Sequence, residues 1–321
     1  MPPLKWGILG AGSVAQRRVI PGMQSLEGHR VSALMVRDMN RAQSLAEKFR
    51  IPNAYSDISG LICDPEVDAV YVSSPVNLHR GHVLAAAEAG KHVLCEKPMA
   101  MTVGECQEMI AVCDRAGVQF QICFVMRGWA IYRHIREMIA EGRLGRVVEI
   151  RAHLAKWSPN QEGWRVDPAQ SGGGVLMDMG AHYFDLFRFL VGDFSRVSAM
   201  GSSEVFQWQT EDTSFVITRF QNGAHGVMGL SFAIPFNGNV LEIYGSKGSL
   251  FLGSDLRVVT SAGEVTEAVV FPDYYRGLLE NFSACVAGRA NPIATGWDGL
   301  RNIEVIEAAY RSDRESRHIG L

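Results

Sequence analysis

The sequence lacks the features of a membrane protein, a secreted protein, a zinc protein or a disulfide-rich protein. No apolar stretch approaches the ~20 residues needed to cross a bilayer. The first apolar strand begins within a few residues of the N-terminus, which leaves no room for a signal peptide. The six cysteines contain no Cys-x-x-Cys pair, so their spacing supports neither a zinc site nor a disulfide framework. We therefore expect a cytoplasmic protein without a metal site or a membrane contact.

An excess of positive charge is also missing, because 31 lysines and arginines stand against 34 aspartates and glutamates, for a net charge of −3. This balance provides no basic surface for nucleic acid. The sequence has no internal repeat, low-complexity tract or long linker. Hydrophobic residues occupy 47% and charged residues 20% of the 321 positions, which is typical of a globular protein long enough for two domains.

The first 124 residues alternate between apolar strands and helices. Strands are expected at 4–9, 31–36, 67–72, 92–95 and 118–124, and helices at 13–27 (interrupted by Pro21), 40–49, 78–89 and 103–116. Alternation of this kind predicts a doubly wound parallel sheet with helices on both faces, hence an α/β domain over residues 1–124.

The pattern changes after residue 124. Strands are expected at 146–156, 196–206, 213–221, 225–234, 239–244, 249–252, 256–260 and 265–270, and helices at 131–141, 174–191, 274–287 and 296–311. Asn222-Gly223 and Ala262-Gly263 are typical of hairpin turns. Residues 125–321 are therefore predicted to form an α+β domain with a large, mostly antiparallel open sheet.

A glycine-rich loop, Gly-Ala-Gly-Ser-Val-Ala at residues 10–15, follows the first strand and opens a helix. Glycines in this context allow a tight turn and a close approach of the backbone to a pyrophosphate, which the helix N-terminus attracts. The pattern favours a dinucleotide site over a turn without a ligand. The predicted contacts are Gly10, Gly12, Ser13 and Val14.

The end of the second strand bears on the choice of cofactor. An NAD site usually has an acidic residue there, on the ribose, but this sequence has Val36 followed by Arg37. Arg37 could pair with a 2′-phosphate, so NADP is the predicted cofactor. NAD is the alternative, with Asp38 on the ribose and Arg37 as a solvated loop residue.

Two further loops follow strands of the same sheet, at Ser73–Pro75 and Glu96–Pro98. Ligands of open α/β sheets bind outside the carboxyl ends of the strands, where all four loops meet. The predicted lining of this cofactor crevice is Ser74, Pro75, His79, Glu96 and Lys97. Two plainer interpretations stay open: His79 could pack against its helix, and Lys97 alone would fit a surface lysine.

The run Gly172-Gly173-Gly174 precedes a predicted helix that carries Asp178 and His182. Residues four apart lie on one helix face, so this carboxylate and imidazole form a candidate acid/base pair. The alternative is a buried capping aspartate with a core histidine.

Together these motifs resemble the Gfo/Idh/MocA family of oxidoreductases, and the similarity covers nearly the whole chain. It depends on the glycine-rich loop, on residues 87–98 with Glu96-Lys97-Pro98, on 142–145, on the Gly-rich segment with Asp178 and His182, and on 244–249. The resemblance implies a Rossmann domain followed by an open α+β domain, whose sheet often forms the interface of a homodimer or homotetramer.

The resemblance also implies roles for residues. Lys97 would bind and polarise the reacting oxygen, His182 would shuttle the proton, and Asp178 would orient His182 or the substrate. Trp164 and Arg165 would contact the substrate, and Tyr274-Tyr275 the substrate or cofactor.

We therefore expect an NAD(P)-dependent dehydrogenase or reductase, moving a hydride between nicotinamide and a sugar, a polyol or a related cyclic alcohol or ketone. One alternative is a cofactor-binding regulator without turnover, which would not need Lys97, Asp178 and His182 together. Another is an NAD-dependent glycosidase that borrows and returns the hydride.

Overall fold

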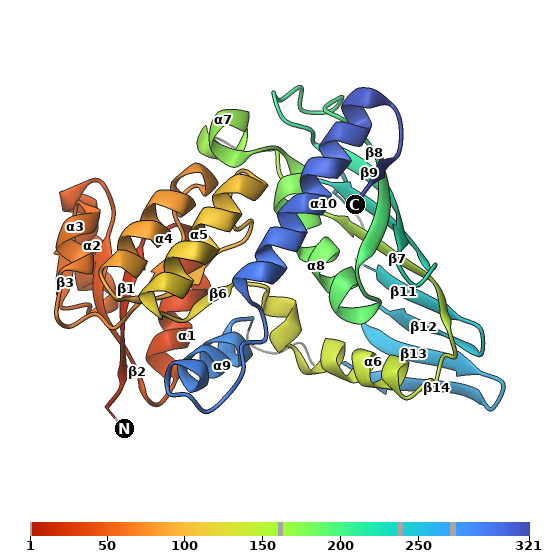
Figure 1. The fold of residues 1–321 in the computed structure, drawn as a ribbon, viewed down its shortest axis with the longest axis horizontal. Coiled ribbons are helices and arrows are strands. Elements are labelled where there is room, and N and C mark those ends of the chain that lie inside the picture. Colours follow the sequence, from red (N-terminus) through yellow and green to blue (C-terminus); the bar gives the residue numbers. More distant parts are fainter. Residues whose placement is uncertain (1, 160–162, 236–239, 270–273) are drawn as a thin grey trace. The chain divides into compact units, whose positions relative to one another are not determined.

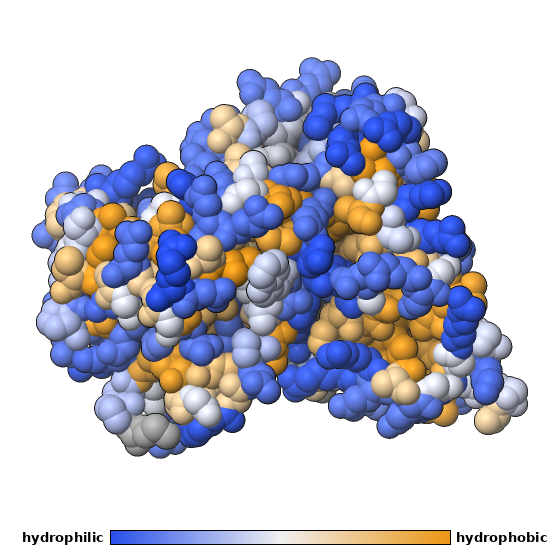
Figure 2. Space-filling view, viewed as in Figure 1, coloured by the Kyte–Doolittle hydropathy of each residue, from blue (hydrophilic) through white to orange (hydrophobic). Residues whose placement is uncertain are grey.

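The computed structural model describes residues 2–159, 163–235, 240–269 and 274–321. Among these, the chain divides into two compact units, Met1–Gly128 with Pro272–Leu300 and Trp129–Phe271 with Arg301–Leu321 (Figure 1). The segment 272–300 thus joins the unit of the first sheet, whereas the division at 124/125 assigned it to the second domain. The face in Figure 2 is largely hydrophilic, with a hydrophobic area over the strands labelled β11, β12 and β13.

The first unit contains a six-stranded sheet in the order β3-β2-β1-β4-β5-β6, with every neighbouring pair parallel. This order, which reverses direction at β1, confirms the predicted doubly wound Rossmann sheet. The strands are β1 (Leu4–Leu9), β2 (His29–Met35), β3 (Asn53–Tyr55), β4 (Ala69–Val72), β5 (His92–Cys95) and β6 (Phe120–Ile122). The sequence analysis missed β3, because three half-buried residues are too few for a recognisable pattern.

The helices of this unit follow the strands closely. They are η1 (Ala15–Val19), α1 (Ile20–Ser25), α2 (Met39–Phe49), α3 (Ile58–Ile62), η2 (Val76–Leu78), α4 (His79–Glu88), α5 (Val103–Ala116), η3 (Val125–Gly128) and α9 (Arg276–Val286). Pro21 is the second residue of α1 and cannot donate a backbone hydrogen bond to the turn before it. That turn is the π-helix η1, so the predicted helix at 13–27 changes from π to α geometry just before Pro21 and continues to Ser25.

The segment that returns from the C-terminal half packs into the core of the first unit. The ring of Phe282 in α9 lies 5.0 Å from that of Trp6 in β1. The Arg127 Nη2 atom donates to Asp298 Oδ1 at 2.9 Å. A Cβ atom on Gly277 would lie only 2.7 Å from the Gly128 carbonyl oxygen, so α9 begins against η3.

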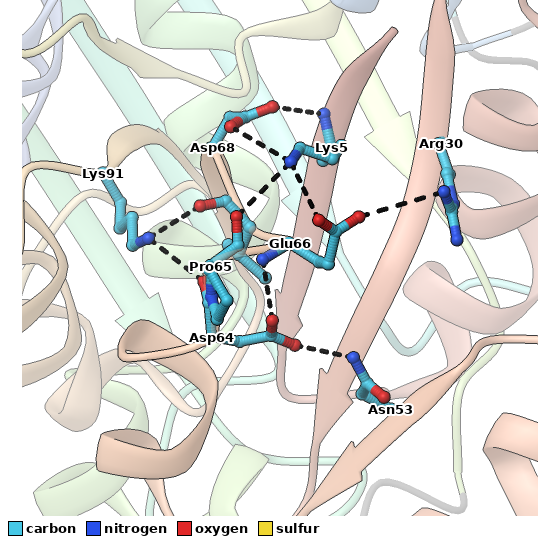
Figure 3. A network of polar contacts seen from close by, with 9 residues as sticks. Lys5, Arg30, Asn53, Asp64, Pro65, Glu66, Asp68 and Lys91 are labelled. Carbon is cyan, nitrogen blue, oxygen red and sulfur yellow. Dashed lines mark hydrogen bonds and ion pairs between the residues drawn. The ribbon is translucent and has the colours of Figure 1, made fainter.

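A polar network ties together the amino ends of the strands, at the edge opposite the predicted site (Figure 3). Lys5 Nζ lies 3.4 Å from Glu66 Oε1, and Lys91 Nζ donates to the Asp64 carbonyl oxygen at 3.2 Å. The Asp64 carboxylate accepts from Asn53 Nδ2 at 2.8 Å and from the Tyr55 hydroxyl at 3.2 Å. The network connects the segment before β4 with β1, with β3 and with the residue before β5. Its role is therefore structural.

The second unit contains a nine-stranded sheet in the order β14-β13-β12-β11-β7-β10-β9-β8-β15. Among the described strands of this second sheet, only β7 and β10 pair in parallel, which confirms the predicted, mostly antiparallel sheet. The strands are β7 (Val147–Ala155), β8 (Phe194–Ser202), β9 (Thr213–Phe220), β10 (His225–Ser231), β11 (Val240–Gly245), β12 (Gly248–Leu252), β13 (Asp255–Thr260), β14 (Gly263–Ala268) and β15 (Ile319–Gly320). Residues 239 and 270, predicted strand ends, lie outside the described residues.

The helices of this unit are α6 (Ala130–Ala140), η4 (Gly163–Arg165), α7 (Pro168–Ser171), η5 (Leu176–Gly180) and α8 (Ala181–Leu190), and α10 (Gly296–Glu315) enters it at Arg301. Figure 1 shows α6 and α8 on the same side of the sheet. Buried and exposed residues alternate along β9, where Val216 is buried and its neighbours Phe215 and Ile217 are exposed. One face of the sheet therefore forms the core. No described helix is long and apolar enough to span a membrane.

Candidate active site

The glycine-rich loop lies against the loop that follows β4. Gly10 has φ 86°, and a Cβ atom there would lie 2.9 Å from the Ser74 nitrogen. The Ser73 hydroxyl donates to the Gly10 carbonyl oxygen at 2.5 Å. A Cβ atom on Gly12, by contrast, would meet no atom within 4 Å, so the protein leaves open space there. Packing within the protein requires glycine at position 10. The open space beside Gly12 is where a dinucleotide fingerprint would let a pyrophosphate approach the protein backbone.

The helix that follows this loop begins with exposed residues. Ser13 and Val14 are exposed, Ala15 is buried, and the Gln16 N–H donates to the Gly12 carbonyl oxygen at 3.0 Å. The first N–H groups of a helix have no partner within it and attract anions. Ser13 and Val14 are thus exposed at the start of this helix, and their contact with a pyrophosphate stays a prediction.

Two arginines lie in the segment after β2, Arg37 in the loop and Arg41 in the first turn of α2. Arg37 is exposed, and Asp38 caps α2 by accepting from the Arg41 N–H at 3.1 Å. The Arg41 Nη2 atom donates to the Ala11 carbonyl oxygen at 3.3 Å, within the glycine-rich loop. The sequence analysis missed Arg41. Its position in the first turn of the helix after the second strand was the available signal.

His79 joins the loops after β4 and β5. Its ring is 1% exposed, with Nδ1 2.9 Å from the Pro98 carbonyl oxygen and Nε2 2.9 Å from that of Ser74. Burial lowers the pKa of His79, although these carbonyl partners oppose the shift. Both ring nitrogens thus have partners inside the protein. The Ser74 hydroxyl is also buried but has no hydrogen-bond partner among the described residues, and Pro75 is half-buried.

Glu96 is held by two tyrosines. Its Oε1 atom accepts from the Tyr71 hydroxyl at 2.7 Å and from the Tyr275 hydroxyl at 2.6 Å, and Oε2 accepts from the Lys97 N–H at 3.2 Å. Burial, together with the nearby carboxylate, raises the pKa of both tyrosines well above the ordinary value. Both hydroxyls therefore stay protonated and donate. Tyr71 was not among the predicted site residues, and the predicted contact of Tyr275 with substrate or cofactor stays a prediction.

The second unit holds the candidate acid/base pair on a helix with one accessible stripe. Of the described residues 173–187, only Asp178 and His182 are not buried. The predicted helix at 174–191 begins with a π-helical turn, η5, and continues as α8. Single π-turns inside helices are frequent at functional sites. This common stripe agrees with the shared helix face expected from the spacing.

Trp164 and Arg165 lie in η4, in the same unit. The Arg165 guanidinium stacks 4.5 Å above the centre of the Trp164 ring, and Arg165 is exposed. A contact of either residue with substrate stays a prediction. The described residues contain no group of three or more His, Cys, Asp or Glu that could hold a metal ion.

Comparison with known proteins identifies the family. The model of an oxidoreductase family with an NAD-binding Rossmann fold matches residues 4–124, and that of the GFO/IDH/MocA C-terminal domain matches residues 132–251. The chain is 33% identical to 1,5-anhydro-D-fructose reductase of Ensifer adhaerens, over 99% of both chains. It is 29% identical to D-xylose 1-dehydrogenase (NADP(+)) 2 of Haloferax volcanii, over 99% of this chain and 100% of the other.

A solved structure agrees with this match over the whole chain. The aldose-aldose oxidoreductase from Caulobacter crescentus, complexed with glycerol, superposes with a TM-score of 0.90 at 31% identity, covering 99% of this chain and 100% of the other. The matches to both family models and to these relatives confirm the resemblance that the motifs carry. The chain belongs to the Gfo/Idh/MocA family and is an oxidoreductase with an NAD(P)-binding Rossmann domain that acts on CH–OH groups.

Proposed function

We propose that the chain is an NADP-dependent dehydrogenase or reductase of a sugar, a polyol or a related cyclic alcohol, with Lys97 and His182 as its acid/base groups. The observation that carries this proposal is that Asp178 and His182 are the two residues of the stretch 173–187 that are not buried. The relatives support the substrate class, because they are named for anhydrofructose, xylose and aldoses. NAD remains the alternative cofactor.

The residues of the first unit fit a dinucleotide. Open space beside Gly12, the exposed start of the helix at Ser13 and Val14, and the unpartnered Ser74 hydroxyl provide room and donors for a polar, anionic molecule. We assign Gly10, Gly12, Ser13, Val14, Ser74, Pro75, Glu96 and Lys97 to this site, and His79 as the residue that holds two of its loops together. When bound, the nicotinamide supplies the hydride chemistry.

Arg37 and Arg41 support the choice of NADP. A guanidinium beside the ribose can donate charge-assisted hydrogen bonds to a 2′-phosphate. Asp38 is engaged in capping α2, which makes it a less suitable ribose ligand. Arg37 is exposed, and Arg41 reaches the glycine-rich loop, so the two side chains mark the position expected for the phosphate.

The chemistry assigns one task to each catalytic residue. When an alcohol is oxidised, its C–H bond breaks with loss of hydride and its O–H bond breaks with loss of a proton. Lys97 donates to the oxygen and stabilises the negative charge that develops there. His182 takes the proton, and Asp178 orients the imidazole. Trp164 and Arg165 are assigned to the substrate.

We further propose that the partner of this chain is a second copy, in a homodimer or homotetramer. The face of the nine-stranded sheet opposite the core carries exposed apolar side chains, including Met200 at 73%, and Phe215 and Ile217 at 58% each. Contiguous exposed apolar residues are typical of association surfaces. Light scattering should give the mass of two or four chains, and a single-chain mass would exclude this assembly.

The test of function is a panel of sugars, inositols and keto-sugars, each with NADP(H) and NAD(H), followed by the absorbance of the reduced nicotinamide. Net change in cofactor with one class of sugar or polyol is the expected result. A regulator would bind cofactor without turnover. A glycosidase that borrows the hydride would release sugar with no net change in cofactor.

Arg37→Ala should weaken NADP binding, and not NAD binding, by roughly ten- to a hundredfold, equivalent to about 1.5–3 kcal/mol for a hydrogen bond to a charged group. The difference should shrink with added salt, because Arg37 is exposed. Arg30→Ala, at the amino ends of the strands, is the matched control. A parent protein that already prefers NAD would exclude the assignment.

A further inference from the structure

The triple glycine before the candidate acid/base helix packs against two half-buried polar residues, Glu211 and Tyr310. A Cβ atom on Gly173 would lie 1.9 Å from the Tyr310 hydroxyl oxygen, and one on Gly174 would lie 2.0 Å from the Glu211 carbonyl oxygen. A larger residue at Gly174 would have to move the backbone, and one at Gly173 would displace the Tyr310 side chain. The glycines therefore allow the start of the helix to approach Glu211 and Tyr310.

Glu211 receives three consecutive backbone N–H groups at this helix start. Its carboxylate accepts from the Gly174 N–H at 3.0 and 3.1 Å and from the Leu176 N–H at 2.9 Å, while its own carbonyl oxygen accepts from the Val175 N–H at 3.0 Å. The first N–H groups of a helix otherwise lack partners, and a carboxylate there also complements the helix dipole. Glu211 is thus the cap of the helix that carries Asp178 and His182.

Helix α10 completes the arrangement inside the second unit. The Tyr310 hydroxyl donates to Glu211 Oε1 at 2.8 Å, and the Asn302 Nδ2 atom donates to the Ala181 carbonyl oxygen at 2.8 Å. Burial, with Glu211 nearby, raises the pKa of Tyr310 well above its ordinary value, so the hydroxyl stays a donor. The helix is therefore held before Asp178 and again beside His182.

We propose that Glu211, supported by Tyr310, is a positioning residue for the reaction, because it determines the rotation of the helix that presents Asp178 and His182. This inference depends on the acid/base role proposed for His182. A shift of one residue at the start of a helix turns its face by about 100°, and a misplacement near 1 Å can lower a rate by about a hundredfold. Glu211 does not touch the reacting atoms and acts through the helix.

The experiment measures kcat, KM and the Kd of NADP for Glu211→Gln, His182→Ala and the double variant. We expect Glu211→Gln to lower kcat by about tenfold to a hundredfold and to leave the NADP Kd within about twofold, because the first unit is unchanged. In the His182→Ala background the same substitution should have little further effect, since both act through one group.

Tyr310→Phe is the second variant, in case Glu211→Gln does not fold, and it should lower kcat by roughly threefold, since it removes one donor of several. Tyr244→Phe is its matched control, because the Tyr244 hydroxyl donates to Glu242 at 2.8 Å on the sheet of the same unit. A lower melting temperature with unchanged kcat in Glu211→Gln and Tyr310→Phe would overturn the inference, as would additive effects in the double variant. Full activity of His182→Ala would instead refute the proposed acid/base role itself.

Discussion

In each unit, a glutamate that accepts from a tyrosine hydroxyl holds the segment before a candidate catalytic residue. In the first unit Glu96 precedes Lys97, and in the second Glu211 caps the helix that carries His182. Glu96 accepts from two tyrosine side chains and from the N–H of Lys97 itself. Glu211 accepts from the backbone N–H groups of a helix start and from one tyrosine. The first glutamate orders a loop through side chains, and the second orders a helix through its main chain.

The difference predicts which substitutions matter at each place. At Glu96 two tyrosine hydroxyls donate to Oε1, so their removal takes two donors from a half-buried carboxylate. At Glu211 the backbone donors remain when the tyrosine is removed. Tyrosine substitutions should therefore be more damaging in the first unit, and glutamate substitutions in the second.

Lys97→Met should have the largest effect of all. Turnover should be abolished, while the Kd of NADP stays within about tenfold, because Lys97 is assigned to the reacting oxygen and not to the pyrophosphate. Steady-state assay and fluorescence titration of the cofactor measure the two quantities. Full activity of this variant would show that Lys97 is not a catalytic residue.

His182→Ala should follow, with a loss in kcat of about 10²–10⁴-fold, the usual contribution of a positioned proton-transfer group. The melting temperature should change little, because the side chain lies on the accessible stripe of its helix. A loss of stability with unchanged specific activity would show instead that His182 is a structural histidine.

Tyr275→Phe should come third, lowering kcat by about tenfold and the free energy of unfolding by about 1.5–3 kcal/mol, as expected when the half-buried Glu96 carboxylate loses one donor. Tyr55→Phe is the matched control, because its hydroxyl also donates to a carboxylate of the first unit, that of Asp64. Asp64 belongs to the network in Figure 3 and not to the Glu96 loop. Equal losses of kcat in both variants would contradict a specific role for the Glu96 loop.

The smallest effect should be on stability as a function of pH. Burial raises the pKa of Glu211 above 4.5, although its hydrogen bonds oppose the shift, so the folded protein binds this proton more tightly than the unfolded chain. The resulting stabilisation is complete below pH 4.5 and is lost as the pH rises through the raised pKa. Glu211→Gln should flatten this part of the profile, as measured by denaturant unfolding. An unchanged slope would show that Glu211 titrates normally.

Much of the candidate site could be predicted because it depends on local patterns. Strand–helix alternation places the loops at Gly10, Arg37, Ser74 and Lys97 at the carboxyl ends of parallel strands. A spacing of four places Asp178 and His182 on one helix stripe. These relations depend only on the geometry of a strand or a helix, which neighbouring residues determine.

The supporting contacts depend on segments that are far apart in the chain. Tyr275 reaches Glu96 across 179 positions, and Tyr310 reaches Glu211 across 99. The parallel pairing of β7 with β10 and the two-residue strand β15 are equally non-local. The periodicity of the sequence does not predict such contacts, because the residues around a tyrosine or a glutamate follow the same pattern whether its side chain is exposed or buried.

The sequence by itself determined the family, the class of cofactor and the candidate residues for the chemistry, because each depends on a short motif whose geometry is local. Only the tertiary structure decided that residues 274–300 return to the first unit, that Arg41 reaches the glycine-rich loop, and that Glu96 and Glu211 each accept from several donors. The physical reason is that the burial of a polar group and its hydrogen-bond partners depend on the packing of the whole chain. Packing determines which polar groups are removed from solvent.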